Sequence, residues 1–382
     1  MTQDGFVDGS VSIEDGVVVE ISKKKSADPA SMGVVLPAFC NAHTHLGDAF
    51  IRIELTGTVE ELVAPPHGLK HRLLEKASEH EVVSGISGAV ESMLHGGTAT
   101  FWDFRETGVE GVRMLYKACL GNAVEPICLG RPKKLAYDDD EVNSLLRVSD
   151  GLGVSSMRDW DYSELQKLST AARRAGKTFA THCSEVVRED IDKVLDLKPD
   201  FLVHMLTATG SDLERCADAG VPIVVCPRSN AFFGKLPNIP FMMSKGVTLL
   251  LGTDNAMLNS PSMLAEIDFA FRAAKLKGHA SPSDIVGMAI RGRKGLSEHA
   301  NFGVRIGDTA RLAVLDVPAG ADPYSAVLRA TDADVALVWL GEKRWQRQRK
   351  EQQERRPRKS QPARRKGSPR GSRGRRISRP KT

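Results

Sequence analysis

Short apolar runs alternate with longer amphipathic stretches through most of this chain. The runs have the length of buried strands, and the segments between them have the apolar spacing of helices. The runs lie at residues 34–39, 98–103, 124–130, 151–155, 178–182, 201–204, 222–226 and 247–252. Parallel strands joined by crossover helices give this alternation, and eight such strands close a barrel. The pattern predicts an α/β protein, specifically a (β/α)8 TIM barrel.

Two of the segments outside the runs have clear helix signals. Residues 79–95 place Val82, Ile86, Val90 and Met93 at helical spacing, and the pair Gly96-Gly97 predicts the end of that helix. Residues 262–277, which follow Pro261, are expected to form one more helix after the eighth strand.

The two ends of the barrel region predict a small β-module. Residues 10–22 read as two strands around Asp15-Gly16, a dipeptide typical of hairpin turns. Residues 302–316 return to short β-runs that would rejoin this hairpin. We therefore expect a composite β-sandwich module built from residues 1–33 and 301–342, with the barrel formed by residues 34–300.

Composition supports a large buried core and a cytoplasmic location. The chain has 382 residues, of which 41% are hydrophobic, enough for one barrel-sized domain and an accessory module. No apolar run of about 18 residues and no signal peptide is present in the sequence. Six cysteines are scattered without a C-x-x-C pair, which indicates reduced core thiols: Cys40, Cys119, Cys128, Cys183, Cys216 and Cys226.

The net charge of +5 averages two unlike segments. Residues 343–382 hold 18 Lys and Arg and two Glu, so the remaining 35 basic and 46 acidic residues give residues 1–342 a net charge of −11. The basic segment has little to bury and is predicted to stay disordered. An arginine-rich segment of this kind can bind nucleic acid by its charge. We favour instead an altered reading frame or a truncated gene end, because the segment begins where a last β-strand would be completed.

Histidines and one aspartate gather at the carboxyl ends of the predicted strands. His43 and His45 follow the first strand two residues apart, so both imidazoles project to the same side. His182 ends the fifth run, His204 ends the sixth and Asp254 follows the eighth. Active sites of such barrels lie at this end. Each residue alone also fits a bland interpretation, a buried core histidine or, for Asp254, a turn or helix N-cap; their coincidence favours a metal site.

These residues resemble the amidohydrolase superfamily. The string LPAFCNAHTHLGD (residues 36–48) is similar to its first-strand signature, and the order His-x-His, His182, His204, Asp254 matches its ligand scheme. Within the superfamily the chain looks like the branch of cytosine deaminases and chlorohydrolases, because His182-Cys183-Ser184-Glu185 matches that branch's His-x-x-Glu. The strings CPRSN (residues 226–230) and GTDN (residues 252–255) add to the likeness, which covers about residues 10–342.

The resemblance implies a role for each matching residue. His43, His45, His182 and Asp254 would bind one divalent cation, and Asp254 would also accept a proton from the attacking water. His204 would stabilise that water or the oxyanion, and Glu185 would carry a proton to the ring nitrogen and then to the leaving group. Without the resemblance, Glu185 reads as a solvated residue in the first turn of a helix.

The fourth strand bears on the number of metal ions. Binuclear members of the superfamily carry a carboxylated lysine there, whereas residues 151–158 contain none. A mononuclear site is therefore expected, unless the strand count is off by one, in which case Lys133 or Lys134 would be the candidate. Zinc is the default for such a ligand set, with iron or manganese as alternatives.

The predicted function is hydrolysis of a non-peptide carbon–nitrogen bond, with deamination of an amino-substituted heterocycle (a purine-like or pyrimidine-like small molecule) as the leading hypothesis. Hydrolysis of a cyclic amide, a urea or a C–Cl bond is the enzymatic alternative, and a catalytically silent protein that binds nucleic acid through its tail is the alternative from another class. We expect no membrane association, and a homodimer would fit the family. Substrate contacts are expected from loop residues after the strands, with Arg131, Arg158, Arg228 and Asn230 as candidates.

Overall fold

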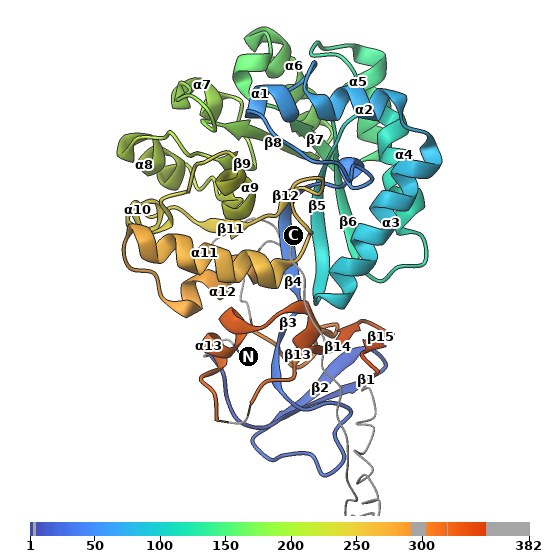
Figure 1. The fold of residues 1–382 in the computed structure, drawn as a ribbon, viewed down its shortest axis with the longest axis vertical. Coiled ribbons are helices and arrows are strands. Elements are labelled where there is room, and N and C mark those ends of the chain that lie inside the picture. Colours follow the sequence, from blue (N-terminus) through green and yellow to red (C-terminus); the bar gives the residue numbers. More distant parts are fainter. Residues whose placement is uncertain (3–4, 292–302, 319, 349–382) are drawn as a thin grey trace, which may run out of the picture. The chain divides into compact units, whose positions relative to one another are not determined.

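The computed structural model describes residues 1–2, 5–291, 303–318 and 320–348. Within them, a parallel sheet curls into a barrel whose strands follow one another in chain order (Figure 1). The strands are β4 (Phe39–His45), β5 (Thr98–Arg105), β6 (Glu125–Gly130), β7 (Gly151–Val154), β8 (Thr178–Cys183), β9 (Phe201–His204), β10 (Ile223–Val225) and β11 (Leu249–Leu251). Just after β11, the short β12 (Asp254–Asn255) pairs in parallel with β4 and closes the ring. The predicted barrel of eight strands is confirmed.

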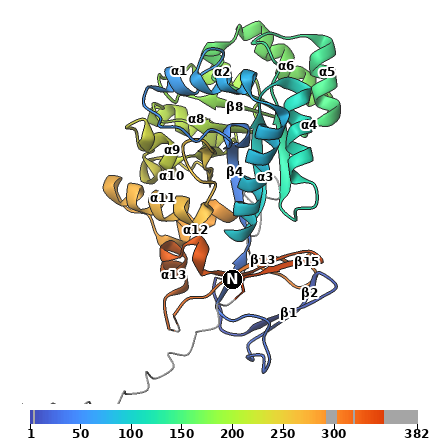
Figure 2. The same cartoon turned by 45° about the vertical axis from the view of Figure 1, so that its right-hand side comes forward.

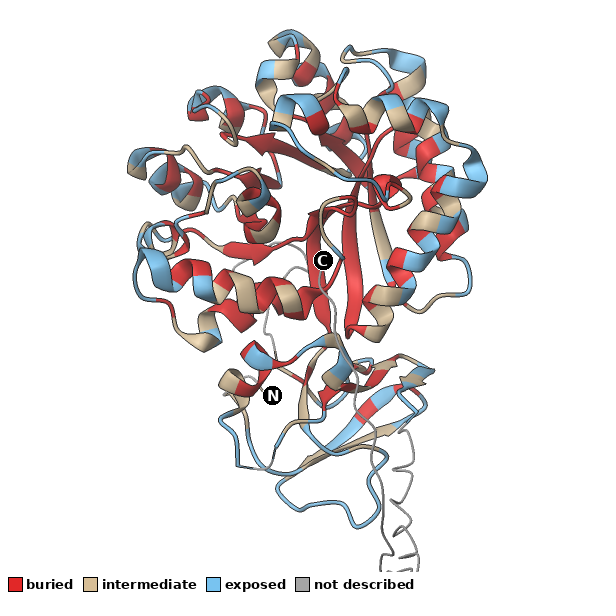
Figure 3. Ribbon diagram, in the orientation of Figure 1, coloured by how far each residue is buried: buried red, intermediate tan, exposed pale blue. Residues whose placement is uncertain are grey.

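Helices cover the outside of this barrel, and α3 packs beside α4 there (Figure 2). The barrel strands are almost wholly buried, whereas each helix turns one side to solvent (Figure 3). The helices are α1 (Val59–Leu62), α2 (Leu69–Lys76), α3 (Glu79–His95), α4 (Gly108–Cys119), α5 (Asp139–Val148), α6 (Tyr162–Arg174), α7 (Ile191–Asp196), α8 (Gly210–Asp218), α9 (Pro227–Phe232), α10 (Ile239–Ser244), α11 (Met263–Lys277), α12 (Pro282–Ile290) and α13 (Pro323–Arg329).

Local sequence fixes several of these helix ends. Ser78 caps α3 with a capping box, in which its hydroxyl accepts from the Glu81 amide and the Glu81 carboxylate accepts from the Ser78 amide. Gly96 then ends α3, as its sequence predicts. Ser262 caps α11 in the same region of the chain where a helix over residues 262–277 was expected. Both predicted helices are confirmed to within one residue.

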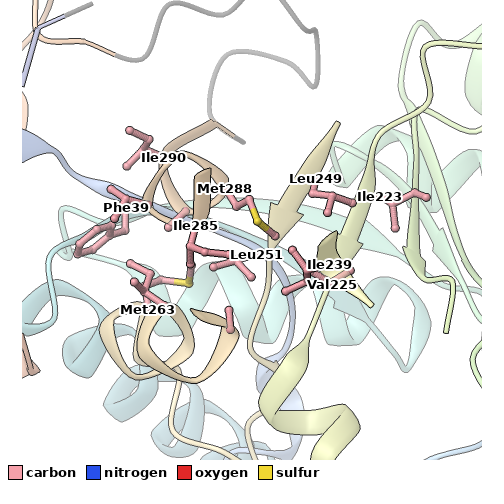
Figure 4. Close-up of a cluster of buried hydrophobic side chains, with 14 of the residues drawn as sticks. Phe39, Ile223, Val225, Ile239, Leu249, Leu251, Met263, Ile285, Met288 and Ile290 are labelled. Carbon is pink, nitrogen blue, oxygen red and sulfur yellow. The ribbon is translucent and has the colours of Figure 1, made fainter. Parts of the chain in front are cut away.

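Alternation along the short barrel strands sorts apolar side chains into an inner and an outer core. Val224 points inward to a cluster that includes Phe104 and Phe201. Its neighbours Ile223 and Val225 point outward to the helices, where they pack in one cluster with residues from β11, α11 and α12 (Figure 4). Neighbouring residues of a strand face opposite sides, so these strands are buried on both faces and read as continuous apolar runs.

The accessory module combines both chain ends. The hairpin β1 (Ser10–Glu14) and β2 (Val17–Ser22) turns at Asp15-Gly16, both at positive φ (+47° and +75°). A second antiparallel sheet has the order β15 (Lys343–Gln346), β14 (Val335–Leu340), β13 (Arg311–Leu315), β3 (Val34–Pro37). Apolar residues of the two sheets, among them Val18 and Leu312, share a small core. The predicted composite β-module is present.

One strand prediction is wrong in its bounds. The run at residues 34–39 is two strands: β3 pairs antiparallel with β13, whereas the first barrel strand is β4. Proline has no amide hydrogen and disrupts a ladder, and Pro37 stands where the chain leaves one sheet for the other. The predicted His43 and His45 therefore lie within the first barrel strand rather than after it.

The disorder predicted from Lys343 onward is also wrong at its start. Residues Lys343–Gln346 form β15, which covers the edge of β14. Trp345 anchors the strand by stacking on His95, with ring centroids 4.6 Å apart. The ring contact of Trp345 thus stabilises a strand in an otherwise basic segment. The rest of the predicted tail from residue 349, and the predicted boundary at residues 300–301, lie outside the described residues.

The six cysteines are buried and form no disulfide among the described residues, in line with the predicted reduced core thiols. Among the described residues, none of the helices is long and apolar enough to cross a membrane.

Candidate metal centre and active site

Five predicted site residues converge at the carboxyl ends of the barrel strands. One ligand atom from each of His43, His182, His204 and Asp254 lies within 4.8 Å of the others, an arrangement that fits a metal ion. His45 belongs to the same group, because its Nε2 lies 3.3 Å from His182 Nε2 and 3.6 Å from Asp254 Oδ1. The coincidence of strand ends in the sequence therefore corresponds to proximity in space.

Hydrogen bonds orient two of the imidazoles toward this centre. The Nδ1–H of His182 donates to the Val154 carbonyl at 2.9 Å. The Nδ1–H of His45 donates to the Phe104 carbonyl at 3.1 Å and to Glu106 Oε1 at 2.9 Å. A neutral imidazole with its proton on Nδ1 has a lone pair on Nε2. Both Nε2 lone pairs therefore point into the centre.

Among the described residues, no hydrogen-bond donor serves these lone pairs. His45 Nε2 and His182 Nε2 face each other at 3.3 Å, and neither ring nitrogen of His43 has a hydrogen bond, although its Nε2 approaches Asp254 Oδ1 to 3.3 Å. Buried polar atoms are normally satisfied, and an exception needs a cause. A cation among three imidazole nitrogens and a carboxylate supplies that cause, so the residues fit a divalent metal ion.

Electrostatics keep the histidines neutral and the aspartate charged. Burial, with Lys70 as a second cause, lowers the pKa of His45 to about 3. Burial also lowers the pKa values of His43 and His182. Burial alone would raise the pKa of Asp254, but the facing histidines hold it well below its ordinary value. Neutral imidazoles and an ionised carboxylate are the protonation states that bind a metal.

Backbone strain marks two site residues. His204 and Asp254 have φ angles of +77° and +62°, a region that residues other than glycine adopt seldom. Asp254 is held there by the β12 ladder with Thr44 and by Ser229, whose hydroxyl donates to Oδ2 at 2.6 Å. Such strain is concentrated at functional sites.

His204 and Glu185 form a second pair beside the ligand group. Asn230 Nδ2 donates to His204 Nδ1 at 3.1 Å, which leaves the proton of this imidazole on Nε2. That Nε2 lies 3.6 Å from Glu185 Oε1. Burial, and then the charge of Asp254, raises the pKa of Glu185 to about 8. A donor and a protonatable carboxylate thus stand together next to the ligands.

A buried carboxylate hub lies behind His45, and sequence reasoning missed its central residue. Glu106 Oε1 accepts from His45 and from Lys70 Nζ at 2.8 Å, while Arg105 donates to Oε2. Arg105 also pairs with Asp103 at 3.3 Å. The signal that would have found Glu106 is its position directly after β5, at the same barrel end as the histidines. Lys70, on α2, has no comparable signal in the sequence.

A cavity of about 300 Å³ opens over these groups. Its lining includes His45, His182, His204, Glu185 and Asp254, together with the predicted Arg131 and Arg158. The other two predicted substrate residues have different partners. The Arg228 guanidinium binds the Ser260 carbonyl at 3.0 Å and lies 3.7 Å from Glu266, and Asn230 supports His204 from behind.

The fourth barrel strand is β7, whose sequence GLGV contains no lysine. The strand count that excluded a bridging lysine there is confirmed, because β7 lies between β6 and β8.

With this geometry in view, the chain belongs to the amidohydrolase family, whose family model matches residues 34–340. It is a hydrolytic enzyme that acts on carbon–nitrogen bonds. The chain is 33% identical over 321 residues to an uncharacterized protein of Methanocaldococcus jannaschii, across 78% of this chain and 82% of that one.

Two further relatives carry names that describe an activity. A 5-methylthioadenosine/S-adenosylhomocysteine deaminase of Halobacterium salinarum is 24% identical over 358 residues, which span 82% of this chain and 81% of that protein. The crystal structure of an adenosine deaminase from Xanthomonas campestris with bound zinc superimposes with a TM-score of 0.71 at 18% identity, covering 88% of each chain. The structural likeness supports the fold.

Proposed function

We propose that this protein is a mononuclear, metal-dependent aminohydrolase that releases ammonia from an amino-substituted heterocycle. The observation that carries the proposal is the convergence of the imidazole nitrogens of His43, His45 and His182 on the Asp254 carboxylate, while no donor of the described residues is directed at the lone pairs of His45 and His182. The names of the deaminase relatives, both of which refer to amino-substituted purine compounds, support the substrate class.

His43, His45, His182 and Asp254 are the residues that would hold the metal ion. Zinc fits this set of nitrogen and carboxylate ligands, and iron or manganese would fit it as well. When bound, a divalent cation lowers the pKa of a water molecule toward neutrality and polarises the carbon under attack. His45 and His182 are fixed for this purpose by the hydrogen bonds of their Nδ1 atoms.

Three residues would move or hold protons. The Asp254 carboxylate accepts a proton from the attacking water, and Glu185 carries a proton at its carboxyl group to the ring nitrogen and then to the departing amine. A raised pKa suits Glu185 to that exchange near neutral pH. His204, with its proton on Nε2, donates a hydrogen bond to the developing oxyanion.

An ammonia-release screen tests this function. The zinc-loaded, iron-loaded and manganese-loaded proteins are assayed with amino-substituted purines, pyrimidines, pterins and triazines. We expect ammonia from at least one class, and none after chelation of the metal. A product set without ammonia but with chloride, or with an opened cyclic amide or urea, would replace deamination with the alternative reaction on the same site.

Location and assembly are part of the proposal. The family's small-molecule chemistry and six buried cysteines outside any disulfide of the described residues support a cytoplasmic enzyme. A homodimer remains a prediction. The proposed nucleic-acid contact through the basic tail would rest on residues outside those described.

A further inference from the structure

The cavity over the site is lined by basic side chains that the reaction itself does not use, together with the acidic Glu60 and Asp159. Lys70, Arg131 and Arg158 line it, along with His67. Arg131 follows directly on β6, so it lies at the same end of the barrel as the metal-binding residues. Hydrolysis at a ring carbon requires the histidines, Asp254 and Glu185, and gives no reason for two guanidinium groups in the same cavity.

Arg131 is buried without a matching partner. The residue is 7% exposed, and among the described residues its guanidinium makes no hydrogen bond; an approach of 3.9 Å to Glu106 Oε1 is its contact with a carboxylate. A buried charge is costly unless it is paired and hydrogen-bonded. A guanidinium presents five donors in a planar fork, which suits two oxygen atoms of one anion.

Glu106 cannot serve as that partner, because its oxygens are already engaged. Oε1 accepts from Lys70 at 2.8 Å and from His45 at 2.9 Å, and Arg105 occupies Oε2. Arg131 is thus the third cation around a single carboxylate, and it lines the cavity.

Hydrogen bonds to Glu189 hold the backbone of Arg158 in place, and Arg158 lines the same cavity. Glu189 Oε1 accepts from the Arg158 amide at 3.1 Å and from the Ser156 hydroxyl at 2.8 Å, and its Oε2 accepts from the Ser184 amide at 2.7 Å. This link ties the loop after β7 to the end of β8. The Arg158 side chain is 44% exposed and pairs with Glu60 at 3.9 Å, so it remains available to a ligand that enters the cavity.

We infer that the substrate heterocycle carries an anionic substituent, a phosphate or a carboxylate, which Arg131 binds as a bidentate partner while Arg158 contacts it from the more exposed side of the cavity. This inference rests on the proposed function for the identity of the heterocycle. Apolar residues of the same lining, among them Val59, Val63 and Val186, are suited to cover the ring. An uncharged substrate would leave the buried Arg131 guanidinium with the 3.9 Å ion pair to Glu106 and, among the described residues, no hydrogen bond.

Binding of small anions gives a first test. Calorimetric titrations of the zinc-loaded protein with inorganic phosphate, and separately with acetate, are compared for the wild type, Arg131→Gln and the matched control Arg147→Gln, whose side chain is exposed on α5. We expect phosphate, acetate or both to bind the wild type and Arg147→Gln with equal affinity. The affinity for the bound anion should fall about 10- to 100-fold in Arg131→Gln, the usual range for a charge-assisted pair. Anion binding that persists in Arg131→Gln, or no binding by the wild type, overturns the inference.

Matched substrates separate this inference from the proposed function. Adenosine and cytidine are compared with their 5′-phosphates and 5′-carboxylates for binding and for ammonia release. We expect one charged form to exceed its parent nucleoside in affinity and in kcat/KM by about 10-fold or more, and Arg131→Gln to lower both quantities more for the charged form than for the parent, so that the preference is lost. The charged form preferred identifies the anion as phosphate or carboxylate.

Each failure has its own signature. Ammonia release from charged and uncharged forms at equal rates would retain the deaminase and contradict the anion site. A preference for anions in binding that depends on Arg131, without ammonia from any compound, would retain the anion site and contradict deamination. Equal losses for charged and uncharged compounds in Arg131→Gln would show a structural role and overturn the inference.

Discussion

Two clusters of buried polar residues meet at His45, and they differ in how well they are satisfied. In the imidazole cluster (His43, His45, His182 and Asp254), lone pairs face one another, and the part of the chain that the structure describes supplies no donor to them. In the carboxylate hub (Lys70, Asp103, Arg105 and Glu106), ion pairs link each charge to another, and Thr44 and the Leu46 amide complete the partners of Asp103.

This difference in hydrogen bonding indicates which of the two clusters binds a ligand. A satisfied network of buried charges holds the fold in place, because removal of one member leaves another charge unpaired. An unsatisfied cluster costs stability in the protein alone and is retained where function requires it. We therefore interpret the carboxylate hub as structural support and the imidazole cluster as the metal site. The hydrogen bond from His45 to Glu106 connects the two.

The largest expected effect comes from the imidazole cluster. His43→Gln should reduce hydrolysis by a factor on the order of 10³ because it removes a ligand of the activating cation. The same change should leave the Tm of the metal-free protein nearly unchanged, since the polar contact that His43 would lose among the described residues is the 3.3 Å approach of its Nε2 to Asp254 Oδ1. A clear drop in the metal-free Tm would contradict the contrast between the clusters.

Glu185 belongs to neither cluster, and its replacement should separate proton transfer from metal binding. Glu185→Gln is expected to lower kcat about 100-fold or more, the usual contribution of a positioned acid or base. Metal content should stay at the wild-type level, because Glu185 contacts His204 rather than the proposed ligands. Elemental analysis beside steady-state kinetics checks both parts, and loss of metal would place Glu185 among the ligands.

The hub should respond in the opposite way to the imidazole cluster. Glu106→Gln leaves Lys70 and Arg105 without their shared carboxylate and should destabilise the protein by about 3–5 kcal/mol. We expect Tm to fall by about 5 °C or more, and zinc affinity to fall about 10- to 100-fold because His45 loses its orienting acceptor. Glu110→Gln, at an exposed position on α4, is the matched control. Equal Tm values for the two variants would refute the hub's structural role.

A third buried carboxylate gives the smallest effect and a dependence on pH. Burial raises the pKa of Glu266 to about 8. A raised pKa means that the folded state holds a proton which the unfolded state releases near pH 4.5, so this residue's contribution to stability is lost as pH rises from about 4.5 to 8. The Tm of Glu266→Gln should therefore rise relative to that of the wild type as the pH increases through that window, because the amide has no proton to release. Parallel Tm curves would contradict the shift.

Much of the fold and of the ligand set followed from periodicity and position. Eight apolar runs predicted the barrel, and the strand ends predicted that His43, His45, His182 and Asp254 would meet. The run at 34–39 misled because an antiparallel edge strand and a parallel barrel strand are equally apolar, and only pairing distinguishes them. Glu106, Lys70 and the role of Trp345 were missed because their partners are far apart in sequence or outside any periodic pattern.

The most direct test of the account is the metal content of the purified protein, measured by elemental analysis for the wild type beside His182→Ala, with the exposed His80→Ala as control. The account predicts about one divalent metal ion per chain in the wild type and in His80→Ala, and a loss of that ion in His182→Ala without loss of fold by circular dichroism. A wild type that binds no metal and stays inactive after addition of zinc, iron or manganese would contradict it.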